Sequence, residues 1–208
     1  MLEDLLKKVG SELTRREEAR DEVLSRARKA RQLSKQAILY VHNNNYDKAG
    51  ENIVKARRLI VETQNNITDF PELDFYEEVE AANEEYAEGA ILLSLEINGT
   101  YPTPEEIGVN PLRYILGLGD VPGELRREAL DELRKGDLEK AEVYLSRMEE
   151  IYTQLVSMEE ASLLLKGIRR KLDIARNVLE STRAEVTAEA GRRRLAETVR
   201  QLTDKLDG

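Results

Sequence analysis

Four glutamates recur at a spacing that places their side chains on one face of a predicted helix. They are separated by three or four residues and stand at Glu77, Glu80, Glu84 and Glu88. At about 100° per residue the four fall in one narrow sector, and no lysine or arginine lies three or four residues away to relieve their repulsion. Such a face stays solvated, meets a basic partner or binds a divalent cation, because Mg²⁺ and Mn²⁺ prefer oxygen ligands. The spacing alone leaves all three interpretations open.

A second pair of acids, Asp120 and Glu124, lies one helical turn apart in a segment interrupted by glycine and proline. In the simplest interpretation Asp120 caps a helix that restarts before Pro122, and Glu124 favours its first turn. In the alternative, the pair joins the glutamates around one metal ion, which would activate water and stabilise charge on a phosphoryl oxygen. The glycines and Pro122 predict a helix break near Asp120.

Charge is segregated along the chain. The formal net charge of −9, taken alone, argues against a nucleic-acid partner. Residues 59–112 contain 13 acids and no lysine or arginine, whereas residues 26–35 contain five basic residues and no acid. Residues 166–194 carry nine basic residues against four acids. Solvated helix faces explain any single run, but they explain the segregation as a whole less well.

Hydrophobic spacing predicts helices over nearly all of the chain. The expected ranges are 2–42, 47–63, 72–95, 110–135 with the break, 138–156, and 159 to beyond 186 with a last segment ending near 206. No stretch alternates with period two, and no repeat or long linker separates domains. We therefore expect an all-α fold, a single domain over residues 1–208 built as a bundle of about six or seven helices. Long helices with few aromatic residues favour a bundle that completes its core by oligomerising.

The composition narrows the function classes. There is no cysteine, which excludes a thiol nucleophile, a disulfide framework and a cysteine-bound metal. No apolar run approaches the roughly 18 residues of a membrane span. Acids interrupt the apolar positions at the N-terminus, which is unlike a signal peptide. We expect a cytoplasmic protein with no membrane partner.

Two central segments resemble motifs of the translin/Trax family. Residues 76–81, Tyr-Glu-Glu-Val-Glu-Ala, resemble its Glu-Tyr-Val-Glu-Ala motif. Residues 114–125, Tyr-Ile-Leu-Gly-Leu-Gly-Asp-Val-Pro-Gly-Glu-Leu, resemble the Trax segment Tyr-Leu-Leu-Gly-Val-Ala-Asp-Leu-Thr-Gly-Glu-Leu. Two outer matches are weaker: Ser34-Lys35 with Ile38 and His42 is similar to a Trax run, and residues 171–173, Lys-Leu-Asp, are similar to a translin Lys-Tyr-Asp. The resemblance spans most of the chain in the family's order.

The resemblance implies a translin-like helical fold and a metal-dependent endoribonuclease that cuts single-stranded RNA. Carried over by position, the catalytic acids fall on Glu77, Glu80 and Asp120, with Glu124 as a neighbouring acid. The first three would hold Mg²⁺ or Mn²⁺, and Glu124 would add a ligand or orient the attacking water. Translin lacks the aspartate of the second motif, so Asp120 places this chain on the Trax side. The long insertion of eukaryotic Trax is absent, which makes the chain similar to a compact, archaeal Trax-like protein.

The resemblance also implies a homo-oligomeric shell, an octamer, with RNA as its partner and single-stranded DNA as an alternative. The basic stretch then becomes a candidate phosphate-contacting track with Arg26, Arg28, Lys29, Arg31 and Lys35. His42 is the only histidine. A lone histidine near a helix end is usually structural, but its family position makes it a candidate RNA contact.

Three other functions remain open at this point, and one of them is a helical scaffold with no nucleic-acid role, which would show no salt-dependent binding. A translin-like oligomer would bind single-stranded RNA or DNA without cutting it, and its binding would fall steeply with salt. A MazG-like nucleotide pyrophosphohydrolase is the other enzyme, because residues 84–88 fit its Glu-Glu-x-x-Glu pattern and residues 128–131 its Glu-x-x-Asp. Both patterns are short in a chain with 41 acids.

Overall fold

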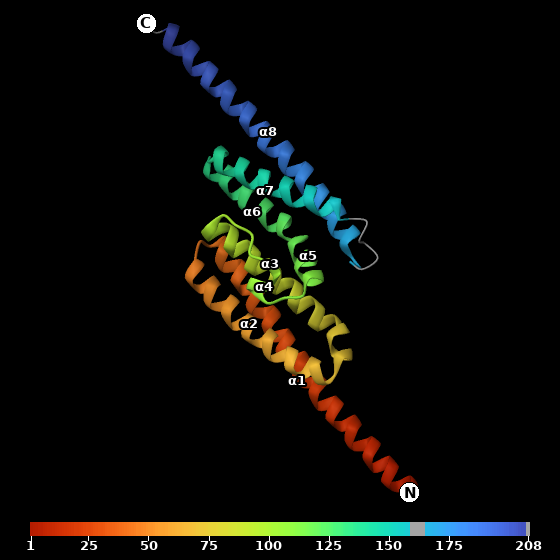
Figure 1. Ribbon diagram of the computed structural model, residues 1–208. Coiled ribbons are helices and arrows are strands. Elements are labelled where there is room, and N and C mark those ends of the chain that lie inside the picture. Colours follow the sequence, from red (N-terminus) through yellow and green to blue (C-terminus); the bar gives the residue numbers. More distant parts are fainter. Residues whose placement is uncertain (159–164, 207–208) are drawn as a thin grey trace. The chain divides into compact units, whose positions relative to one another are not determined.

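The computed structural model describes residues 1–158 and 165–206, and these are almost entirely helical (Figure 1). No strand occurs in this part of the chain, so the predicted all-α class is confirmed. The chain forms two compact units, Met1–Gly117 and Leu118–Gly208, and each is described by itself. The prediction that residues 1–208 fold as a single domain stays a prediction.

The first unit is a layer of three long helices. α1 (Leu2–His42) packs against both α2 (Tyr46–Asp69) and α3 (Glu77–Asn98). A 3₁₀ helix (η1, Pro71–Phe75) joins α2 to α3, and the short α4 (Pro104–Ile107) and α5 (Pro111–Leu118) follow. α1 extends beyond its two partners towards the N-terminus (Figure 1), and residues 2–18 of this helix are exposed.

Small residues bring these helices close together. Val23, Ala27, Ala30 and Ala37 of α1 are buried, as are Ala82 and other small or aliphatic residues of α3. Burying such side chains removes apolar area from water at roughly 25 cal/mol per Å². The buried faces of α1 and α3 are therefore the ones that the apolar spacing predicts.

The largest differences from the predicted helix boundaries in this unit are at the end of α2 and the start of α3. α2 continues to Asp69 instead of ending at residue 63, because Ile67 is buried and extends the apolar stripe of Ile60. Helix α3 begins at Glu77 and not at residue 72, since residues 71–75 form the 3₁₀ helix and Tyr76 has an extended backbone. The acidic residues of α3 therefore start in its first turn.

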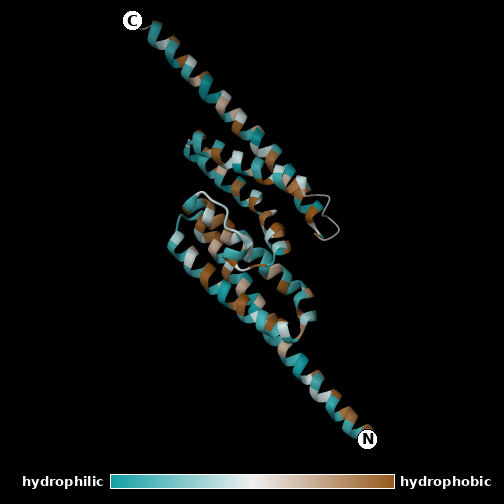
Figure 2. Cartoon of the chain, in the orientation of Figure 1, coloured by the Kyte–Doolittle hydropathy of each residue, from teal (hydrophilic) through white to brown (hydrophobic). Residues whose placement is uncertain are grey.

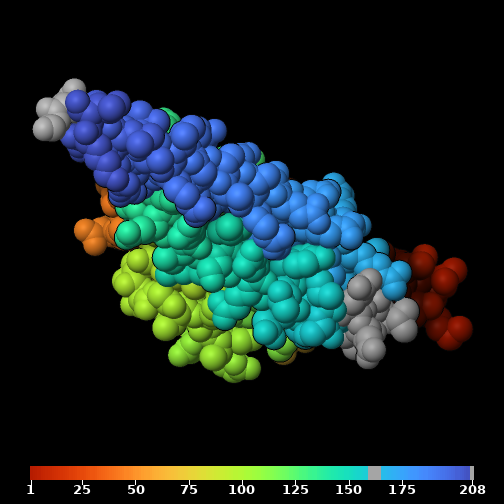
Figure 3. All heavy atoms as spheres, turned by 90° about the horizontal axis from the view of Figure 1, so that it is seen from above, coloured from red at the N-terminus to blue at the C-terminus, as the bar shows by residue number. Residues whose placement is uncertain are grey.

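The second unit contains α6 (Val121–Lys135), α7 (Leu138–Ser157) and α8 (Ile168–Leu206). The first half of α8 lies against α6 and α7 (Figure 3), and Leu125, Met148, Leu155 and Ile168 are fully buried there. The predicted break is confirmed, because α5 ends at Leu118 and α6 starts at Val121. The predicted helix start at residue 159 lies outside the described residues.

Both long helices end in exposed apolar stripes, which appear as brown bands among hydrophilic residues in Figure 2. The stripe of α1 contains Leu2, Leu6, Val9 and Leu13. The stripe of α8 contains Leu195, Val199, Leu202 and Leu206. The steps between these positions are four, three and four residues in both helices, the spacing of a helix seam that packs against another helix. No helix among the described residues has the length and apolar character needed to cross a membrane.

Candidate carboxylate and nucleic-acid site

The acidic face of α3 runs from solvent towards the interior. Glu77 is exposed, Glu80 and Glu84 are half-buried, and Glu88 is buried. Val79, Ala82 and Tyr86 are buried on the opposite side, as the helical spacing predicts. The four glutamates therefore do share one face, but their environments differ.

Arg113 of α5 sits on this face. Its Nη1 lies 3.3 Å from Glu84 Oε1, and its Nη2 donates a short hydrogen bond to Glu80 Oε1. The arginine side chain is only 19% exposed, so solvent screens these interactions incompletely. The repulsion between Glu80 and Glu84 is thus offset by one guanidinium from another helix. The spacing of charges along α3 does not reveal this partner, because Arg113 belongs to a different helix.

Arg113 reaches α3 because α5 crosses it closely at Gly117, one turn further on. A Cβ at Gly117 would lie 2.7 Å from the backbone oxygen of Glu84 and 2.7 Å from Ala87 Cβ. Such distances exclude any side chain at this position without a backbone shift. Residues four apart share a helix face, so the crossing at Gly117 directs Arg113 towards the glutamates.

In the second unit, Asp120 is held by a lysine. Asp120 occupies the cap position of α6, but its side chain makes no capping hydrogen bond. Its Oδ2 instead accepts a hydrogen bond of 2.5 Å from Lys171 Nζ of α8. The lysine side chain is 17% exposed. Glu124 is half-buried in the first turn of α6, where a negative charge is favourable.

The predicted metal ligands divide between the units, with Glu77 and Glu80 in the first and Asp120 and Glu124 in the second. Over the described residues of either unit, no three acidic or histidine side chains form a metal-ligating group. Their donor chemistry nevertheless fits Mg²⁺ or Mn²⁺, since all four side chains offer carboxylate oxygens and none is fully buried. The metal site stays a prediction, and its cation must replace Arg113 at Glu80 and Lys171 at Asp120.

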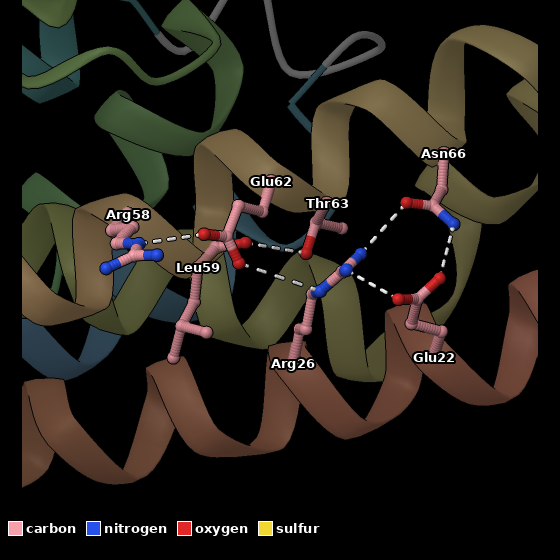
Figure 4. A network of polar contacts seen from close by, with 7 residues as sticks. All are labelled: Glu22, Arg26, Arg58, Leu59, Glu62, Thr63 and Asn66. Atoms are coloured by element: carbon pink, nitrogen blue, oxygen red, sulfur yellow. Dashed lines mark hydrogen bonds and ion pairs between the residues drawn. The ribbon is translucent and has the colours of Figure 1, made fainter.

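Arg26 belongs to a network that joins α1 to α2 (Figure 4). Its guanidinium bonds Glu22 Oε1 at 2.5 Å and Asn66 Oδ1 at 2.9 Å, and its Nε lies 3.8 Å from Glu62 Oε2. Asn66 in turn donates to Glu22 Oε2. Arg26 therefore uses its donors on three partners from α1 and α2.

Three of the other predicted phosphate contacts on α1 lie on a different, exposed face of the helix. Arg28, Arg31 and Lys35 are exposed and follow each other at i, i+3 and i+7, so they share one face. Arg31 Nε lies 3.3 Å, and Lys35 Nζ 3.8 Å, from Glu85 Oε2 of α3. This basic face, defined by Arg28, Arg31 and Lys35, therefore borders the acidic helix.

Two further predicted contacts also lie on α1. Lys29 is exposed, and its Nζ bonds Gln32 Oε1 at 3.3 Å. His42 is half-buried in the last turn of the helix. Its RNA contact stays a prediction.

Known proteins of similar length resemble the chain. No family model matches it. It is 29% identical over 180 residues to an uncharacterised protein of Methanocaldococcus jannaschii, and the match covers 84% of this chain and 78% of that protein. Among solved structures it is similar to apo-NeC3PO, with 27% identity over 88% of this chain and 96% of that chain and a TM-score of 0.80.

The chain is also similar to AfC3PO. The identity is 31%, the coverage is 90% of this chain and 98% of that chain, and the TM-score is 0.83. AfC3PO in complex with duplex RNA matches equally well, with 31% identity, 90% and 97% coverage and a TM-score of 0.82. The likeness thus extends over both units.

Proposed function

Because the chain belongs to the translin/Trax family, which includes the C3PO proteins, we propose that it binds RNA as an oligomer and hydrolyses single-stranded RNA with Mg²⁺ or Mn²⁺. The observation that carries RNA binding is the likeness, over 90% of this chain, to a protein solved with duplex RNA. Since that structure contains duplex RNA, the experiments use both single-stranded and duplex RNA. The proposal that the protein also cleaves RNA is supported by the two acidic motifs.

The basic face of α1 is the proposed phosphate contact. Its three side chains are exposed, and each cation that neutralises a phosphate releases counterions, so binding weakens as salt rises. Lys29 and His42 are further candidates on the same helix. Arg26 contributes by holding α1 against α2 through Glu22 and Asn66, which keeps the helix that carries the basic face in place.

Glu77, Glu80 and Asp120 are the proposed ligands of the divalent cation, and Glu124 orients the attacking water or adds a ligand. A bound divalent cation supplies positive charge opposite the phosphoryl oxygens and lowers the pKa of water. Glu77 is exposed, whereas Glu80 and Asp120 must first be released by Arg113 and Lys171. Nη2 of Arg113 and the ammonium of Lys171 are then available to RNA phosphates, which accept strong charge-assisted hydrogen bonds.

A non-catalytic RNA-binding oligomer is the second candidate, and one observation favours it. Arg113 and Lys171 neutralise two of the three proposed metal ligands inside the protein. A protein that needs no cation would keep these ion pairs while RNA is bound. Metal dependence of cleavage therefore separates the two candidates.

The exposed apolar stripes of α1 and α8 support the oligomer. Monomeric soluble proteins rarely expose contiguous apolar patches of this kind unless another surface covers them. The resemblance to the family suggests eight copies. Light scattering on purified protein should give about eight times the mass of one chain, and a monomer at micromolar concentration would contradict this part of the proposal.

Cleavage is tested with labelled single-stranded and duplex RNA in the presence of Mn²⁺, Mg²⁺ or EDTA. Wild-type protein is compared with Asp120→Asn, which keeps the shape and removes the charge, and with Asp173→Asn as a matched control. Asp173 is exposed and pairs with Arg176 one turn further along α8. We expect metal-dependent cleavage that Asp120→Asn abolishes and Asp173→Asn retains. RNA that is bound but never cut would favour the second candidate.

Binding is tested separately by its salt dependence. Replacing Arg28, Arg31 and Lys35 by alanine should weaken RNA binding and reduce the slope of log K against log salt by about three. Arg26→Ala should leave this slope nearly unchanged, because its donors are already used by Glu22 and Asn66. Equal slopes for wild type and the triple variant would remove the basic face from the proposal.

A further inference from the structure

A pocket of about 510 Å³ lies in the first unit, away from the acidic face of α3. It is bounded by α2, the C-terminal half of α3 and the segment from Thr100 to Ile107. Ile53, Leu93 and Ile97 line its apolar wall, and Tyr101 adds an aromatic ring. Its volume falls in the range of small-molecule sites, which combine an apolar lining with a few polar groups.

Arg57 is the cation of this pocket. Its neighbours on α2 have carboxylate partners, since Lys55 Nζ lies 3.3 Å from Glu51 and Arg58 Nε lies 2.8 Å from Glu62. Over residues 1–158 and 165–206, no hydrogen bond or ion pair engages the Arg57 guanidinium. A guanidinium offers five N–H donors in a planar fork. Arg57 therefore presents unused donors at an apolar wall.

The turn at the end of α4 lies beside this guanidinium. Gly108 has a φ of +73°, and a Cβ at that position would lie 3.7 Å from both Nε and Nη2 of Arg57. The left-handed backbone favours glycine here. The exposed guanidinium thus lies beside the turn that follows α4.

Tyr86 and Glu106 also line the pocket, and neither forms a hydrogen bond or ion pair with Arg57 in the described part of the chain, although the Glu106 carboxylate adds a negative charge to the lining. The hydroxyl of Tyr86 donates to the carbonyl oxygen of Ile107 at 2.9 Å, and burial raises the pKa of Tyr86 to about 12, while the charge of Arg57 opposes the shift. The phenol therefore stays neutral near pH 7. Glu106 caps α4, because its Oε2 accepts a hydrogen bond of 2.7 Å from the backbone nitrogen of Thr103.

We infer that this pocket binds a nucleoside monophosphate, with its phosphate on Arg57 and its base against Tyr101 and the apolar wall. Planar guanidinium matches phosphate oxygens in a bidentate geometry, and bases stack on aromatic side chains whatever their sequence. The choice of a nucleotide over another anion that carries a planar ring rests on the proposed function. The site would take a single nucleotide, such as the end or a released product of an RNA chain.

Binding of adenosine 5′-monophosphate is measured by calorimetry on the full chain. Adenosine and hexanoate are the comparison ligands, and Arg57→Ala is compared with Arg58→Ala. Arg58 is the matched control, because it is the adjacent exposed arginine and pairs with Glu62. We expect wild type and Arg58→Ala to bind the monophosphate equally. Arg57→Ala should bind it at least tenfold more weakly, and adenosine should bind wild type at least tenfold more weakly.

RNA binding in the same samples separates the two proposals. If RNA binds and the monophosphate does not, the pocket inference is overturned while the proposed function stands. If the monophosphate binds through Arg57 but RNA does not bind, the inference is supported and the proposed function falls. Hexanoate that binds as tightly as the monophosphate would overturn the assignment of a nucleotide.

Discussion

The ammonium group of Lys171 lies 2.5 Å from a carboxylate oxygen of Asp120, across 51 residues of sequence. The pair joins the start of α6 to α8, and the lysine side chain is largely shielded from solvent. An aspartate at the head of a helix normally caps it, but this one makes no capping bond. Its carboxylate pairs with the ammonium of Lys171 instead, which would compete with the proposed divalent cation.

Lys171→Met should therefore tighten the binding of a divalent cation. The substitution keeps the length of the side chain and removes the competitor for Asp120. We expect the Mn²⁺ concentration for half-maximal cleavage or binding to fall at least threefold. Titration of Mn²⁺ followed by electron paramagnetic resonance measures this directly. Lys166→Met, at an exposed position, serves as the control, and an unchanged Mn²⁺ affinity in Lys171→Met would contradict the assignment of Asp120.

Arg113→Gln should destabilise the first unit. The substitution leaves Glu80 and Glu84 facing each other without the guanidinium that joins them. Because the site is only partly exposed, we expect a loss of about 1–2 kcal/mol in the free energy of unfolding, between the values for surface and buried ion pairs. Urea denaturation measures the loss, and Arg134→Gln is the control, since Arg134 forms an exposed pair with Asp131. Equal losses in both variants would argue against the bridging role.

Gly117→Ala should also destabilise the protein, because its Cβ would meet the backbone oxygen of Glu84 at 2.7 Å. Forcing α5 away from α3 costs about 1–3 kcal/mol, as for other overpacked contacts. Gly123→Ala is the matched control, since no atom lies within 4 Å of the place its Cβ would take, and it should be neutral or slightly stabilising. Thermal unfolding of both variants gives the comparison. Equal melting temperatures would show that α5 does not cross α3 this closely.

Glu132 gives the second unit a pH-dependent contribution to stability. Burial raises the pKa of Glu132, but hydrogen bonds from Lys135 and Lys140, at 2.9 and 3.1 Å, outweigh burial and lower the pKa below its ordinary value. A carboxylate with a depressed folded-state pKa stabilises the protein above its unfolded pKa, and this stability is lost as pH falls through the folded value.

Glu132→Gln should therefore lower the free energy of unfolding at pH 7 more than at pH 3. Urea titrations at the two pH values measure the difference between the variant and wild type. Glu139→Gln is a control, because Glu139 is exposed in the first turn of α7 and its pH dependence should follow wild type. A pH-independent loss in Glu132→Gln would assign the effect to packing instead of charge.

Local patterns predict much of the fold. The bounds of α1, the break between Leu118 and Val121 and the buried face of α3 follow from apolar spacing and from glycine and proline. The end of α2 does not, because residues 64–69 have weak helix propensity and only the burial of Ile67 keeps them helical. Tertiary packing decides such boundaries.

The partners of the acids could not be predicted from spacing. Arg113 reaches Glu80 across 33 residues, and Lys171 reaches Asp120 across 51. The sequence singles out both cations only weakly. Arg113 is the first cation after residues 59–112, which contain no lysine or arginine, and Lys171 lies in a segment that resembles the family. Only the helix crossings turn these positions into ion pairs. The same holds for Arg26, whose sequence context is that of an exposed cation but whose contacts are internal.

Because the ends of α1 and α8 are exposed, we expect the helical content of these ends to depend on protein concentration. Residues 1–18 and 191–206 are exposed and almost wholly helical, and isolated helices of this length are marginal in water. In the proposed oligomer, association would supply free energy that keeps them ordered, and by mass action this contribution grows with the logarithm of protein concentration. We expect the ends to fray first in dilute solution, and the helical fraction of the chain to rise with protein concentration.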